Sequence, residues 1–139
     1  MRAILTVTIS ALMLAGCASE PSYDKSAMPN ATTALRQAKA LCEKEQTASK
    51  YTDCEVVAQH DFVVAIHLQK MDAFDAYAAQ MMALAADWDA GRLSRNHLAA
   101  RAASIRNDYL FACNCGLGGR RGGGPFSYDI TRSIIMPRP

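Results

Sequence analysis

The sequence predicts an all-α protein: a small helical hairpin or three-helix domain with one long central helix and a flexible C-terminal tail rich in Gly and Arg. Three observations predict it. Residues 55–90 contain neither Gly nor Pro and repeat apolar residues at heptad spacing. The shorter segments before and after it repeat apolar residues at the spacing of an α-helix. Six glycines between residues 116 and 124 then end the pattern.

The first 17 residues have the features of an export signal. Arg2 precedes an apolar stretch over residues 3–13, which is too short to span a bilayer but suits a signal peptide. The next four residues resemble the lipobox of bacterial lipoproteins, and they are Leu14, Ala15, Gly16 and Cys17. The resemblance implies that residues 1–16 are a signal peptide, removed before Cys17, and that the Cys17 thiol carries a covalent lipid.

The lipid defines the expected location. Two or more acyl chains hold a protein stably at a membrane. In the family, Asp after the lipidated Cys favours retention in the inner membrane, so Ala18 implies the outer membrane. We therefore expect a lipid-anchored protein of the bacterial cell envelope, facing the periplasm. Residues 17–32, which are mostly polar and contain Pro21 and Pro29, are expected to form the lipidated end and a tether.

The helical domain is expected over residues 33–112. Its first helix is predicted at residues 33–48, and a short break follows at 49–53. The apolar face of this helix consists of Leu35, Ala38, Leu41 and Cys42.

The central helix is predicted over residues 55–90, with a length of about 54 Å. We call its apolar register the heptad stripe, and it consists of Val57, His60, Val64, His67, Met71, Phe74, Ala78, Met81, Ala85 and Trp88. Val63, Tyr77 and Leu84 widen it. A register this long favours packing against partner helices.

Gly91 is expected to end the central helix, and Ser94 to cap the next one at residues 95–112. Leu93 and Leu98 are placed to form a hydrophobic staple across that cap. The apolar face of the last helix consists of Leu98, Ala102, Ile105, Tyr109 and Ala112. Because both connections are short, both outer helices should pack antiparallel to the central one. They leave part of the stripe for the tail (residues 113–139), a second copy or a partner to cover.

Four cysteines remain after lipidation, an even number that suggests disulfides in an exported protein. Cys42 lies near the end of the first predicted helix, and Cys54 lies at the start of the central helix. The short connection between these helices brings the two cysteines together, so we favour their pairing. Cys113 and Cys115 would then pair with each other or stay reduced. A shorter or bent central helix would restore the pairs Cys42–Cys113 and Cys54–Cys115.

The sequence shows no catalytic nucleophile with a paired base and no nucleotide-binding loop. The formal net charge of +2 gives no argument for nucleic-acid binding. The first hypothesis is a non-enzymatic lipoprotein that binds an envelope protein or itself, with no cofactor besides its lipid. The alternative is a metal- or redox-responsive lipoprotein, because soft ligands recur along the chain. These candidates are His60, His67, Met71, Cys113 and Cys115. Their spacing matches no standard zinc pattern, and such residues are more often core or interface residues.

Overall fold

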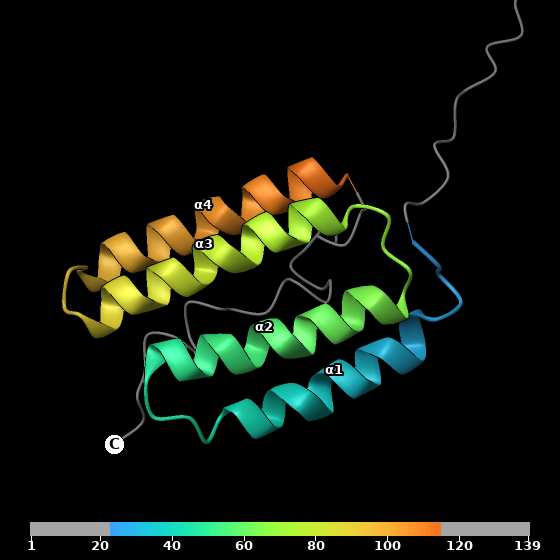
Figure 1. Cartoon of the computed structure of the whole chain (residues 1–139), viewed down its shortest axis with the longest axis horizontal. Helices are drawn as coiled ribbons and strands as arrows, with labels where there is room; N and C mark the ends of the chain where they lie inside the picture. Colours follow the sequence, from blue (N-terminus) through green and yellow to red (C-terminus); the bar gives the residue numbers. More distant parts are fainter. Residues whose placement is uncertain (1–22, 115–139) are drawn as a thin grey trace, which may run out of the picture.

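The computed structural model describes residues 23–114, and this part of the chain is helical throughout, apart from its turns. Four helices follow one another: α1 (Met28–Cys42), α2 (Ala48–Ala65), α3 (Met71–Asp89) and α4 (Arg95–Cys113). They lie side by side, each antiparallel to the one before (Figure 1). The all-α class is confirmed, with four helices in the described residues instead of two or three.

The prediction of one long central helix is wrong. The segment breaks at residues 66–70, where His67 has a left-handed backbone with φ of 52°. The N–H of His67 donates to the Val64 carbonyl at 3.0 Å, and the N–H of Leu68 donates to the Val63 carbonyl at 2.9 Å. These two bonds form a Schellman motif, the usual end of a helix. The break lets α2 and α3 fold back and bury their sides against each other.

The same motif ends α3 at Gly91, as predicted. Gly91 has φ of 68°, and its N–H donates to the Trp88 carbonyl at 2.9 Å. The N–H of Arg92 donates to the Asp87 carbonyl at 2.9 Å. A Cβ built on Gly91 meets no atom within 4 Å. Any cost of a side chain at this position therefore comes from the backbone conformation alone.

These two turns form a matched pair for mutation. We expect Gly91→Ala to lower the free energy of unfolding by about 1 kcal/mol, since an L-residue is strained at this φ. His67→Gly should raise it by up to about 1 kcal/mol for the same reason. Urea denaturation followed by circular dichroism measures both. Shifts of the same sign in the two variants would contradict this account.

Two boundaries near the N-terminus differ from the predictions. Helix α1 covers residues 28–42, not 33–48, because Pro29 suits the first turn of a helix. The predicted break at residues 49–53 is the start of α2. There the Thr47 hydroxyl caps the helix by accepting from the N–H of Lys50 at 3.3 Å.

The start of α4 follows the prediction closely. The Ser94 hydroxyl accepts from the N–H of His97 at 3.4 Å. Leu93 is partly buried against the core, and Leu98 is fully buried, as the predicted staple requires. The helix ends one residue later than expected, at Cys113.

Substantial packing occurs only between helices that are consecutive in the chain, so the described residues form a single layer of helices. Asp89, the last residue of α3, ties α3 to the start of α2. Its carboxylate accepts from the N–H groups of Ala48 at 2.9 Å and Ser49 at 2.8 Å. Burial raises the pKa of Asp89, but the hydrogen bonds from Ser49 and Ala48 outweigh it and lower the pKa overall.

The heptad stripe divides between core and surface. Its α3 half is core, with Phe74, Met81 and Ala85 at most 1% exposed. Its α2 half is not, since Val57 and Val64 are 56% and 50% exposed. Helix α2 instead buries another side, which consists of Ala48, Tyr51, Thr52, Glu55, Ala58, Gln59, Phe62 and Val63. Leu41 and Ala112, which were expected on apolar faces, are exposed as well.

The folded domain begins before the end of the predicted tether. Tyr23 packs against the core, and the N–H of Asp24 donates to the Ile66 carbonyl at 2.7 Å. The chain therefore joins the domain at the end of α2, and residues 28–32 already belong to α1. The expected signal peptide and C-terminal tail lie outside the described residues and stay predictions.

Candidate functional site

The layer has an apolar surface that we call the outer face. It consists of Val57 and Val64 on α2 and of Ala76, Ala79, Ala83 and Ala86 on α3, all exposed. The spacing of seven residues on α2, and of three or four on α3, puts each set on one side of its helix. Each set lies opposite the side that its helix turns to the core. The two sets therefore share one side of the layer.

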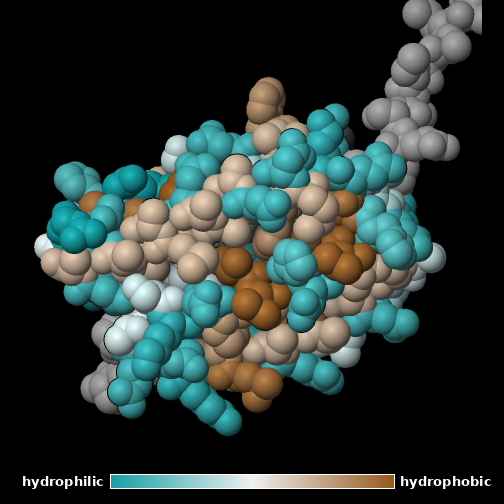
Figure 2. All heavy atoms as spheres, in the orientation of Figure 1, coloured by the Kyte–Doolittle hydropathy of each residue, from teal (hydrophilic) through white to brown (hydrophobic). Residues whose placement is uncertain are grey.

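Figure 2 shows how apolar this side of the molecule is. Brown and tan residues run across the middle of the view, over the region of α2 and α3, with hydrophilic residues around them and some between them. Single exposed apolar residues are ordinary, but a contiguous group of them marks an interaction surface. Alanines let another helix approach closely, because they add little bulk.

The opposite side of the layer, which we call the inner face, is buried. It consists of Glu55, Gln59, Phe62 and Ile66 on α2 and of Phe74, Tyr77 and Met81 on α3, each at most 5% exposed. The Tyr77 ring lies 4.9 Å from the Tyr109 ring of α4, measured between centroids. The inner face thus contains both packed aromatic rings and buried polar groups.

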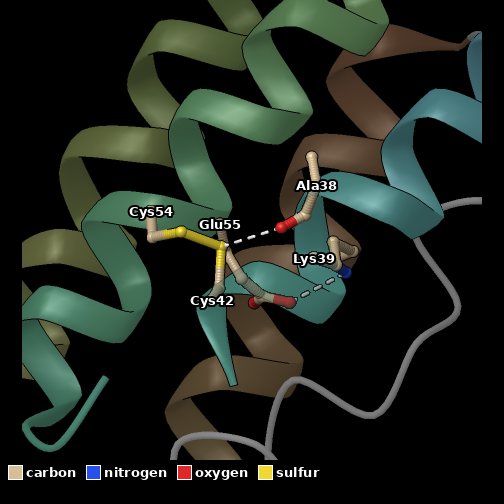
Figure 3. The surroundings of a disulfide bond; sticks show 5 residues. All are labelled: Ala38, Lys39, Cys42, Cys54 and Glu55. Carbon is tan, nitrogen blue, oxygen red and sulfur yellow. Dashed lines mark hydrogen bonds and ion pairs between the residues drawn. A yellow bond between two sulfur atoms is a disulfide. The ribbon is translucent and has the colours of Figure 1, made fainter. Parts of the chain in front are cut away.

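A buried ion pair joins α1 to this face. The Lys39 ammonium lies 2.9 Å from the Glu55 carboxylate, and their side chains are only 12% and 7% exposed (Figure 3). Sequence reasoning missed this pair, because Glu55 and Gln59, one turn apart, resemble an ordinary solvated face. Only the distant partner Lys39 distinguishes the two cases.

Two tyrosines on the inner side have perturbed acidity. Burial raises the pKa of Tyr77 far above its usual value near 10, and the negative charge of Glu55 adds to the shift. Burial also raises the pKa of Tyr109. Both hydroxyls therefore stay protonated at physiological pH and act as hydrogen-bonding groups, not as bases.

The structure contains the favoured disulfide, Cys42–Cys54, with a Cα–Cα distance of 5.6 Å. It links the end of α1 to α2, and the Sγ of Cys42 also lies 3.5 Å from the Ala38 carbonyl oxygen (Figure 3). Cys42 is fully buried and Cys54 is partly buried. The alternative pairs Cys42–Cys113 and Cys54–Cys115 are thereby excluded.

The remaining predicted ligands are dispersed. His60 lies on α2 with half of its side chain exposed, near Asp61 and 6.0 Å from the Phe74 ring. His67 occupies the turn after α2, and Met71 begins α3. Cys113 is fully buried at the end of α4 and is bonded in a disulfide, so it offers no thiolate ligand in this state.

The structure brings no group of three His, Cys, Asp or Glu side chains together around a metal position within residues 23–114. The lipobox residues and Cys115 lie outside the described residues. Within that same part of the chain, no helix has the length and apolar character needed to cross a membrane.

Comparison of the chain with protein-family models, with curated proteins and with solved structures finds no match.

Proposed function

We propose that this protein is a non-enzymatic, lipid-anchored lipoprotein of the bacterial envelope, and that its outer face binds a second copy of the chain. The anchor is the lipid on Cys17, which the lipobox resemblance supports. Docking is supported by one observation of the structure: half-exposed valines on α2 continue into a row of exposed alanines on α3. A shared apolar side of this kind suits a two-fold contact, in which the same residues meet from both copies.

The outer face also explains the heptad stripe. Val57 and Val64 repeat at the spacing of helices that pack along their length. They are not used in the core of their own domain. A second copy would bury them and would provide the partner helix that the pattern predicts.

Self-association is measured by sedimentation velocity of residues 18–139 over a range of concentrations. We expect a concentration-dependent dimer for the wild type and a monomer for Val57→Lys/Val64→Lys, because buried ammonium groups without partners are costly. The matched control places the same two charges on exposed positions of α1, as Ala34→Lys/Ala40→Lys. It should dimerise like the wild type.

A wild type that stays monomeric at all concentrations, or a control that loses the dimer equally, would contradict the proposal. The two lysine variants must keep the wild-type circular dichroism spectrum, so that loss of dimer is not loss of fold.

A further inference from the structure

The outer face contains a titratable side chain among its apolar residues. His60 lies one turn after Val57 and one turn before Val64 on α2, a spacing that puts all three on one side of the helix. Half of the His60 side chain is exposed. Its ring lies 6.0 Å from the Phe74 ring of α3, measured between centroids. The imidazole therefore lies on the α3 side of the valines, where the α2 part of the outer face meets the α3 part.

The charged groups around this imidazole are mostly exposed carboxylates. The Asp61 carboxylate lies 3.8 Å from Nδ1 of His60, and its side chain is 80% exposed. Helix α1 packs on the other flank of α2, where its Lys39 is paired with Glu55. The remaining charged positions on this side of α2 and at the start of α3 are also exposed, and they are Asp53, Asp72 and Asp75. In a single copy, water screens the attraction of such carboxylates for a protonated imidazole.

A second copy on the outer face would change the surroundings of His60. It covers the valines one turn before and one turn after the imidazole, so it also removes water from the ring. A neutral imidazole tolerates this burial, whereas an imidazolium loses its hydration. In a two-fold contact each copy brings its own His60, so the cost arises twice.

We propose that His60 makes association through the outer face sensitive to pH: copies associate when its imidazole is neutral and separate when it is protonated. This inference rests on the proposed function, because it needs the second copy on the outer face. Histidine is the side chain whose charge ordinarily changes between about pH 5 and 8. Separated copies bind protons that associated copies exclude, so a fall in pH favours separation.

The other two histidines lie away from the outer face and provide controls within the same chain. His67 occupies the turn after α2, and His97 lies in the first turn of α4, where it is exposed. A variant of His60 keeps both of them. Loss of the pH response in that variant therefore assigns the response to His60.

The test is sedimentation velocity of residues 18–139 at about pH 7.5 and about pH 5.5, which lie on the two sides of the ordinary histidine range. For the wild type we expect the dimer dissociation constant to rise by about tenfold or more on acidification, since a difference of one pKa unit between two states corresponds to a factor of ten. In His60→Gln the side chain is neutral at both pH values, so the constant should change by less than about twofold. The matched control, His97→Gln, should respond to pH like the wild type.

The outcomes separate this inference from the proposed function. A wild type that is monomeric at both pH values contradicts both. A wild-type dimer whose dissociation constant stays unchanged or falls on acidification overturns this inference alone, because the contact then accepts the imidazolium. A pH response that persists in His60→Gln also overturns it, and His60→Asn repeats that comparison with a shorter neutral side chain. Circular dichroism at both pH values checks that loss of dimer is not loss of fold.

Discussion

Removal of the Cys42–Cys54 disulfide is expected to lower the free energy of unfolding by about 3 kcal/mol. The two cysteines are 12 residues apart, and the stabilisation from closing a loop of this size in the unfolded chain is of that order. The link matters for the whole of α1, because that helix packs substantially only on α2 within the described residues. Loss of the disulfide should therefore loosen α1 before the other helices.

The variant for this measurement is Cys42→Ala/Cys54→Ala, which leaves no free thiol at either site. Urea denaturation followed by circular dichroism gives the free energy, and hydrogen exchange shows whether α1 amides lose protection first. Adding a reductant to the double variant reports separately on the disulfide of Cys113. A change below about 1 kcal/mol would mean that helix packing, and not the covalent link, holds α1 in place.

Lys39→Met is expected to lower the free energy of unfolding by about 3 kcal/mol, because it leaves the buried Glu55 carboxylate without its cation. Glu55→Gln should cost less, since the amide is neutral and similar in shape. In Lys39→Met/Glu55→Gln no uncompensated charge remains. The double variant should therefore be more stable than Lys39→Met alone, even though it carries one more substitution.

The control for this cycle is an ion pair at the surface. Arg92 and Asp87 form a contact of 2.6 Å, but their side chains are 62% and 32% exposed. Water screens such a pair, so Arg92→Met should change stability by less than about 1 kcal/mol. A loss in Arg92→Met as large as that in Lys39→Met would show that burial is not the cause of the difference.

Local signals in the sequence were sufficient for α4 and for the end of α3. Ser94, Leu93 and Gly91 act through bonds and contacts within a few residues, so their roles can be predicted without knowing the fold. The break at residues 66–70 has no such signal, because the segment lacks Gly and Pro. It depends on tertiary packing, which outweighs the strain of a left-handed His67.

The disulfide was predictable for the same local reason, since the short connection between two consecutive helices brings Cys42 and Cys54 together. The burial of the polar groups on the inner face was not predictable from the sequence. Glu55 and Gln59 are typical of a solvated helix side, and their burial depends on Lys39 and Tyr77, which lie far away in the sequence. The outer face was partly foreseen, because Val57 and Val64 belong to the predicted stripe. Its surface position follows from the rotation of α2, which only the fold reveals.

The hydrogen bond from Asp24 to Ile66 would also limit how far a lipid-anchored domain can move from the membrane. If Cys17 carries the lipid as we propose, only the link from residue 17 to residue 23 separates it from the folded chain, a reach of about 20 Å. The start of α1 and the end of α2 would then stay within about that distance of the bilayer. Confinement to a plane raises the effective concentration of the anchored copies, so a contact that is weak in solution would be well populated at the membrane.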